Sequence, residues 1–161
     1  MALAVITTGA ALIRTGTGAS QILEDLGYTI NGVTIIENVY MSDVPGDQNG
    51  GDEGPPIDIQ YFGQVDRIRM EFSKFDQLVA DKIRPRLEGG TAGTVGTAGT
   101  LITAGTKYFR LLIEPTSLPR NYLAAIPREP IEVNRGTKFS RLILEFECHA
   151  IGGVLWDTTT A

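Results

Sequence analysis

The side chains best suited to chemistry in this sequence are carboxylates, and several of them lie close together between residues 41 and 60. This acidic segment contains no Lys or Arg, and its acids are Asp43, Asp47, Asp52, Glu53 and Asp58. Outside it, fourteen Asp and Glu balance fourteen Lys and Arg, so the net charge of -5 comes from the acidic segment. Because Pro, Gly and Asn are frequent between the acids, the composition predicts a solvated loop over residues 41–60.

Oxygen donors at this density are candidates for a calcium site. Ca²⁺ takes roughly six to eight oxygen ligands, and the donors lying closest together are Asp47, Asn49, Asp52 and Glu53. Their spacing is not that of an EF-hand, and the Gly-Gly-Asp sequence is not repeated as it is in calcium-binding β-rolls. We therefore predict no metal and no other cofactor. A calcium- or carbohydrate-binding β-sandwich module that uses residues 43–58 remains the alternative function.

The sequence offers little for catalysis. His149 is the single histidine, so any Ser-His-Asp triad would have to use it. The alternating pattern around it predicts an outward-facing position on a strand, among Glu145 and Glu147. Arg141 lies beside these two acids, so we expect them to form ion pairs on an exposed face. No Gly-x-Ser-x-Gly elbow precedes it, and the glycine-rich run at residues 14–20 lacks the lysine of a phosphate-binding loop. We predict that the chain is not an enzyme.

Charge and composition also bear on partners and compartment. The sequence pI of about 4.9 argues against gripping nucleic acid by its phosphates, which requires a surplus of Lys and Arg. Cys148 is the single cysteine, so no intrachain disulfide can form. The first residues do not form a secretion signal, and no stretch approaches the ~18–20 apolar residues of a membrane helix. These features predict a soluble protein without a membrane anchor, folded in a reducing cytoplasm. The acidic balance also suits a surface that DNA approaches without specific binding.

Apolar alternation predicts two long strands. Over residues 66–72 it directs Ile68, Met70 and Phe72 inward. Over residues 141–150 the inward set is Leu142, Leu144, Phe146, Cys148 and Ala150. A further strand is expected over residues 107–114.

Three other local signals complete the expected fold. Helical spacing over residues 75–84, stopped by Pro85, predicts one helix, and Asn31-Gly32 predicts a hairpin turn within residues 28–40. A Gly-Thr-x repeat within residues 88–106 predicts a surface loop or a loosely paired hairpin, or an extension that becomes ordered against a neighbouring subunit. The expected fold is mainly β: an antiparallel β-sandwich or barrel with one flanking α-helix and long loops, in a single domain over residues 1–161.

Several segments of the chain resemble the tail tube (major tail) proteins of tailed bacteriophages. They are residues 26–33 (LGYTINGV), 55–63 (PPIDIQYFG), 68–72 (IRMEF) and 130–146 (PIEVNRGTKFSRLILEF). The Gly-Thr-x segment is not part of the resemblance. The resemblance implies a β-sandwich subunit that closes into hexameric rings, which stack into a hollow tube through which the genome leaves.

This resemblance leads to a structural function and a set of partners. The expected partners are other copies of the chain and the other tail proteins of a virion, in which the protein would be located after synthesis in the host bacterium. Head decoration, neck and tail terminator proteins are alternatives within the same class. Rings form when contacts between unlike surfaces close by rotation, and axial contacts extend them into tubes.

The acidic segment is the expected contact between subunits. Burying its carboxylates without partners would be prohibitive, so the neighbouring surface should supply cations. The expected sources are Arg67 and Arg69 on the outward face of a strand, and Arg84 and Arg86 at the end of the predicted helix.

Overall fold

The computed structural model describes residues 12–17, 24–87, 91, 93–114, 119–128, 130–134 and 141–158. Its elements, in chain order, are β1 (Leu12–Thr17), β2 (Glu24–Val44), the 3-10 helix η1 (Asp47–Asn49), β3 (Asp58–Phe75), α1 (Gln77–Ile83), β4 (Phe109–Glu114), β5 (Arg120–Pro127), β6 (Glu132–Asn134), β7 (Arg141–His149) and β8 (Trp156–Asp157). The predicted mainly-β class, with one flanking helix, is confirmed.

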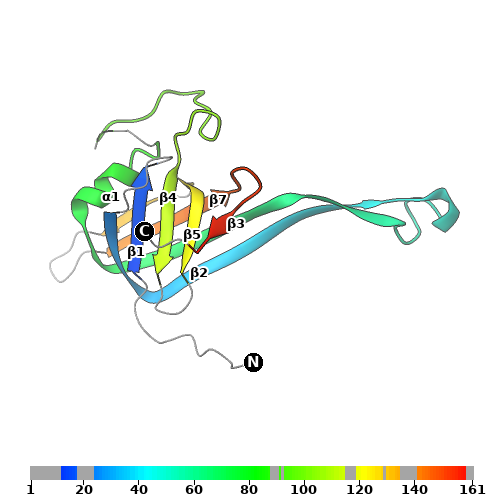
Figure 1. Cartoon of the computed structure of the whole chain (residues 1–161), viewed down its shortest axis with the longest axis horizontal. Coiled ribbons are helices and arrows are strands. Elements are labelled where there is room, and N and C mark those ends of the chain that lie inside the picture. The colour runs from blue at the N-terminus through cyan, green and yellow to red at the C-terminus, as the bar shows by residue number, and fades with distance from the viewer. Residues whose placement is uncertain are drawn as a thin grey trace.

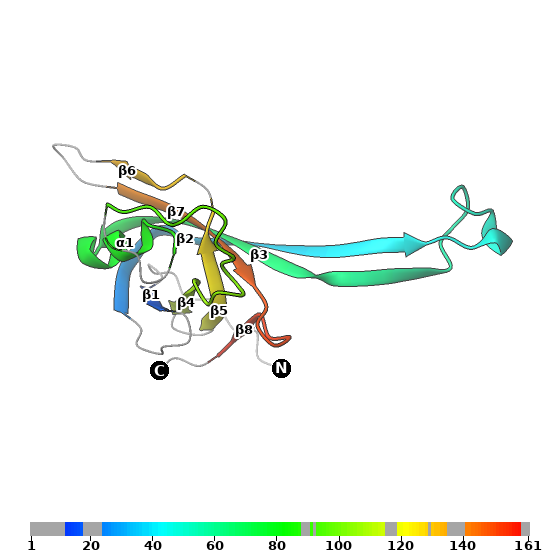
Figure 2. The same cartoon turned by 90° about the horizontal axis from the view of Figure 1, so that it is seen from above.

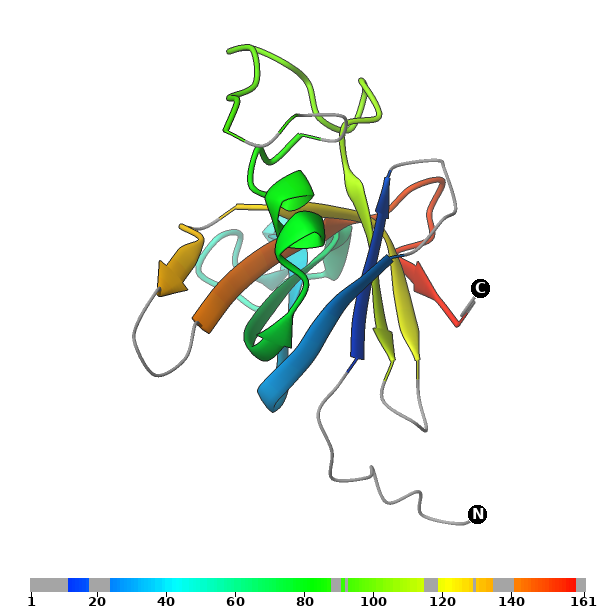
Figure 3. The same ribbon diagram turned by 90° about the vertical axis from the view of Figure 1, so that its left-hand side faces the viewer.

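All eight strands belong to one antiparallel sheet that curls into a half-barrel (Figure 3). The strand order is β6-β7-β3-β2-β1-β4-β5-β8. One edge of β7 pairs with β3, and the opposite edge is shared: residues 141–143 pair with β6, and residues 146–149 pair with β5. This second pairing brings two distant parts of the sheet together around a common interior.

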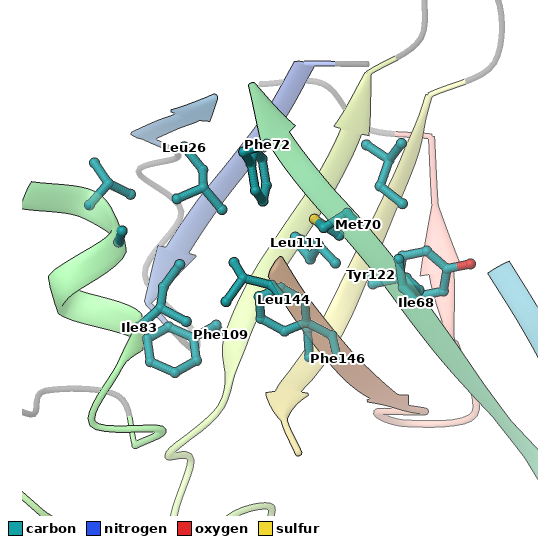
Figure 4. Packing of buried hydrophobic residues seen from close by; sticks show 14 of the residues in the cluster. Leu26, Ile68, Met70, Phe72, Ile83, Phe109, Leu111, Tyr122, Leu144 and Phe146 are labelled. Carbon is teal, nitrogen blue, oxygen red and sulfur yellow. The ribbon is translucent and has the colours of Figure 1, made fainter. Parts of the chain in front are cut away.

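The core fills that interior with the inward-facing residues of the alternating strands. Ile68, Met70 and Phe72 of β3 lie opposite Phe146, Leu144 and Leu142 of β7, respectively, and all six are buried (Figure 4). Cys148 is buried as predicted, whereas Ala150 is exposed, because β7 ends at His149 and the alternation ends with it. The strand expected over residues 107–114 is observed as β4.

Helix α1 packs on the core at the end of the body opposite the long hairpin (Figures 1 and 2). The predicted range was 75–84, but Phe75 is the last residue of β3, and the helix begins only after Asp76. The Asp76 side chain accepts hydrogen bonds from the backbone N–H groups of Leu78 and Val79, the usual role of an N-cap. Helical spacing then places Val79, Ala80 and Ile83 on one face, and all three are buried.

The prediction of a hairpin turn at Asn31-Gly32 is wrong. Both residues have positive φ, 62° and 75°, but β2 does not reverse there. Thr29 pairs with Phe72 and Val33 with Met70, so the residues between them form a bulge inside one continuous strand. The left-handed conformations that favour a turn are accommodated here by an insertion, because pairing with β3 continues on both sides.

The reversal occurs much later, and it produces the most prominent feature of the molecule. β3 pairs with β7 only from Asp66 to Phe72, so residues 58–65 pair with β2 alone among the described strands. These residues, together with residues 38–44 of β2 and the connecting tip at residues 45–57, project from the body as a long two-stranded ribbon (Figures 1 and 2). We call residues 38–65 the arm. The acidic segment, expected as a loop over residues 41–60, is therefore strand at both ends and loop only at the tip.

The Gly-Thr-x segment folds as a series of turns at the surface. The sequence Thr-Ala-Gly-Thr occurs at residues 91–94, 97–100 and 103–106, and in each copy the last Thr N–H donates to the first Thr carbonyl. Gly93 and Gly99 take positive φ in their turns. The described residues of this segment contain no strand pairing, so its unit is a turn every six residues. Separately, no helix among the described residues is long and apolar enough to cross a membrane.

Candidate interaction site on the hairpin arm

The arm carries a concentration of exposed large apolar side chains. Seven of them are between 45% and 61% exposed: Val39, Tyr40, Met41, Ile57, Ile59, Tyr61 and Phe62. An exposed apolar surface of this kind marks an interaction site more often than a solvated loop. The acidic segment is therefore part of a surface that is both charged and apolar.

Strand register groups part of this surface on one face. Met41 lies opposite Tyr61, and Asp43 lies opposite Ile59; directly opposed residues of an antiparallel pair share a face. Alternation along β2 places Val39 on the same face. The same alternation leads back to Ile35, which packs against the core. The apolar stripe, which we define as Val39, Met41, Ile59 and Tyr61, thus continues the core-facing side of the sheet beyond the body.

The tip gathers the predicted carboxylates at the far end of the arm. Asp43 and Asp58 are strand residues near the tip, Asp47 opens η1, and Asp52 and Glu53 lie in the following turn. All five are exposed. Backbone hydrogen bonds from Gly51 to Gly46 (3.1 Å) and from Ile57 to Val44 (2.9 Å) close the tip into a compact turn.

Between the tip carboxylates there is a small open hollow. Its volume is about 120 Å³, and its lining includes Asp43 and Asp52. Among the described residues, no group of three or more His, Cys, Asp or Glu side chains is placed to hold a metal ion.

The predicted basic partners lie elsewhere in the chain. Arg67 is on the outer face of β3, 3.6 Å from Glu145 and 3.8 Å from Glu147. Arg84 lies after α1, 3.0 Å from Asp81, and Arg86 donates to the Arg84 carbonyl oxygen at 3.1 Å. The acids and these arginines are not brought together within one chain.

Arg69 differs from the other three arginines. It is exposed on the outer face of β3, and within the described part of the chain it makes no hydrogen bond or ion pair. It borders a hollow of about 260 Å³ next to the bulge at Asn31 and Gly32. Of the four predicted sources of positive charge, Arg69 and Arg86 form no ion pair with another described residue, and Arg69 is the more exposed of the two.

The outward face of β7 carries ion pairs, as predicted, although with different partners. His149 Nε2 lies 2.8 Å from Glu147 Oε1, and Arg128 reaches the same glutamate at 3.3 Å. Arg141, expected beside these acids, pairs instead with Glu71 of β3. The predicted position of His149 on an outward strand face is confirmed.

A polar cluster with a buried centre lies at the base of the arm and was not anticipated from the sequence. Asp66 is fully buried, and each of its carboxylate oxygens accepts one hydrogen bond at 3.0 Å, from the Gln64 amide and from the Tyr122 hydroxyl. Arg120 donates to the Tyr122 hydroxyl oxygen at 3.1 Å and to Glu37 at 3.3 Å. We call these five residues the root network. The signal was present, because the alternation that buries Ile68, Met70 and Phe72 also directs Asp66 inward.

Two further properties characterise the root network. The Arg120 guanidinium lies over the Trp156 ring, 4.4 Å from its centroid, a cation–π contact that adds β8 to the cluster. Burial raises the pKa of the Tyr122 hydroxyl well above its ordinary value; hydrogen bonding to Arg120 opposes this rise, and the Asp66 charge adds to it. Tyr122 therefore remains a hydrogen-bond donor at any physiological pH.

The fold is similar to that of subunits in solved gene transfer agent particles. Over 93% of this chain and 96% of the other, it matches a chain from the structure described as "Tail of empty GTA particle computed with helical refinement, C6 symmetry", with a TM-score of 0.54 and 12% identity. A chain from "Virion of native gene transfer agent (GTA) particle" matches over 93% and 95%, with a TM-score of 0.52 and 10% identity. No protein-family model and no curated protein matches the sequence. At this identity the likeness establishes a shared fold over nearly the whole of both chains.

Proposed function

We propose that this chain is a non-enzymatic structural protein of a virion, and specifically a tail tube subunit that forms stacked hexameric rings. The observation that carries the proposal is the fold, which is shared over 93% of this chain with a chain of a C6-symmetric gene transfer agent tail. The resemblance of segments such as residues 55–63 and 68–72 to tail tube proteins is independent of that comparison. The calcium- or carbohydrate-binding alternative is not favoured by the comparisons.

The arm supports self-association. Its apolar stripe is exposed in the single chain, and covering it would remove apolar area from water, which is the main favourable term in association. The end of the arm adds five exposed carboxylates, none of which forms an ion pair with another described residue. A surface that meets this arm needs both apolar contacts and positive charge, and the exposed Arg69 beside its hollow offers the latter on a second copy.

The acidic balance also fits a conduit for DNA. A tube wall that holds phosphates by many Lys and Arg contacts would retain the genome. Here most arginines on the outer face of β3 and β7 are matched by acids, as Arg67 is by Glu145 and Glu147 and Arg141 is by Glu71. We expect no measurable affinity for duplex DNA at physiological salt.

Electron microscopy and mass photometry of the purified chain test the proposal. We expect rings with sixfold symmetry, or tubes built from them. A strict monomer at high protein concentration, under several salt conditions, would contradict the tube function. A compact monomer whose melting temperature rises with calcium would instead support the alternative that uses residues 43–58.

A further inference from the structure

We propose that the root network is a lock that fixes the direction in which the arm leaves the barrel. Such a lock would act within a single chain, so it is separate from the proposed assembly function. It consists of Glu37, Gln64, Asp66, Arg120 and Tyr122, with Trp156 stacked against the arginine.

The position of the network is the first argument. The pairing of β3 with β7 ends at Asp66, on the side of the arm. Glu37 is the direct partner of Asp66 on β2. Beyond this pair, the arm is a two-stranded ribbon. Isolated two-stranded ribbons twist strongly and are only marginally stable on their own. The direction of the ribbon must therefore be set at the point where it joins the barrel.

The second argument is that both strands of the ribbon are tied to the same third strand. Tyr122 of β5 bonds to Asp66 of β3, and Arg120 of β5 bonds to Glu37 of β2. In the sheet, β5 pairs with β4, β7 and β8, and not with β2 or β3. The buried Tyr122–Asp66 bond and the exposed Arg120–Glu37 pair thus tie both strands at the base of the arm to β5, in addition to the backbone ladder.

The third argument is chemical. A buried apolar cluster would fill the same space without the cost of desolvating a carboxylate. Hydrogen bonds are directional, however, and Asp66 joins an arm residue, Gln64, to a barrel residue, Tyr122, through its two oxygens. Figure 4 shows the Tyr122 hydroxyl group at the edge of the apolar cluster. Directional contacts at this edge fix an angle, whereas apolar packing tolerates several.

Distance measurements within one chain test the lock. Nitroxide labels are placed at the tip and on the barrel through Gln48→Cys and Glu132→Cys, both at exposed positions, while the buried Cys148 stays in place. The labelled chain is diluted with unlabelled protein, so that double electron–electron resonance reports intrachain distances only. A chain without the introduced cysteines shows whether Cys148 takes up label.

Two root variants and one control decide the outcome. Tyr122→Phe removes the hydroxyl that joins Asp66 and Arg120, and the partly exposed Arg120→Gln removes the tie to Glu37 even if Tyr122→Phe does not fold. We expect both variants to broaden the distance distribution relative to the parent. The control Arg141→Gln removes the Arg141–Glu71 ion pair on the outer face of β3 and should leave the distribution unchanged. If Tyr122→Phe and Arg120→Gln both give the parent's distance distribution, the proposed lock is wrong.

A second readout connects the lock to assembly and rests on the proposed function. A preset arm loses less conformational freedom when it docks, so Tyr122→Phe should raise the protein concentration at which rings or tubes form, although Tyr122 itself is fully buried. Assembly of the variant at the parent's concentration would show that arm direction does not limit assembly. If the parent itself never assembles, the proposed function fails, while the distance measurement still decides whether the lock exists.

Discussion

The Tyr122 hydroxyl donates a 3.0 Å hydrogen bond to the Asp66 carboxylate, joining residues 56 positions apart in the sequence. Both residues are fully buried. The bond spans the barrel from β5 to β3, and the second oxygen of Asp66 is occupied by Gln64. A carboxylate buried in this way is compensated only while both donors remain in place.

Removing one donor should therefore destabilise the fold. We expect Tyr122→Phe to lower the free energy of unfolding by about 1–3 kcal/mol, because Asp66 would be left buried with an unsatisfied oxygen. Urea denaturation measures the change. Tyr61→Phe, at an exposed site on the arm, is the matched control and should stay within about 0.5 kcal/mol of the parent. Equal stability of the two variants would show that the bond contributes nothing.

The same hydroxyl should make stability depend on alkaline pH. Because the pKa of Tyr122 is raised in the folded chain, the unfolded chain releases this proton first. The contribution to folding is complete below the unfolded pKa of about 10 and is lost as pH rises toward the folded pKa. Between about pH 8 and about pH 11, the parent should lose more free energy of unfolding than Tyr122→Phe does, as measured by urea denaturation. Equal losses would contradict the assignment.

Local patterns predicted the body of the molecule well. The alternation in β3 and β7 identified most of the inward-facing residues of each strand, because each strand has one buried face and side chains alternate with a period of two. The helix was also expected, although its start was placed two residues early. Such patterns show which residues of a single strand or helix are buried, and they depend only on the sequence of that element.

The arm and its root depend on pairing between distant segments. Asn31-Gly32 has the conformation of a turn but lies within a strand, since β3 pairs on both sides of it. Asp66 was in an inward register, but its partner Tyr122 can be identified only once the barrel brings β5 near β3. The contact residues proposed for the acidic segment remain a prediction, because their partners would lie on another molecule.

The start of α1 gives a separate test of local stability. Replacing Asp76 by Ala removes the acceptor for the N–H groups of Leu78 and Val79, so the free energy of unfolding should fall by about 1 kcal/mol. Asp76→Asn keeps an acceptor and should recover most of the loss. If Asp76→Asn and Asp76→Ala are equally destabilised in thermal or urea unfolding, capping is not the cause.

The apolar stripe of the arm should be needed for assembly but not for folding. We expect Met41→Ser combined with Tyr61→Ser to leave the circular dichroism spectrum and unfolding midpoint unchanged, since both residues are exposed, and to abolish or weaken oligomer formation in sedimentation velocity. The control is Val95→Ser with Leu101→Ser, which changes two exposed apolar residues outside the arm. Loss of assembly in the control alone would place the contact on the Gly-Thr-x segment.

The carboxylates of the tip should control the salt dependence of assembly. In the triple variant Asp47→Asn, Asp52→Asn and Glu53→Gln, the fold should persist, and assembly should weaken and lose much of its sensitivity to ionic strength. A second triple variant, Glu24→Gln, Asp25→Asn and Glu132→Gln, removes the same number of exposed carboxylates from the body and serves as the control. A tip variant that assembles like the parent at low and high salt would make the tip a solvated end without a contact.

The length of the arm gives its base mechanical leverage. From the Glu37–Asp66 pair to the Val44–Asp58 pair, the ribbon extends roughly 20–25 Å at about 3.3 Å per residue. A rotation of about 10° at the base would therefore displace the start of the tip by roughly 4 Å, which exceeds the length of a hydrogen bond. A few buried atoms near Asp66 can thus decide whether a distant carboxylate meets its partner, and substitutions there can act on contacts that they never touch.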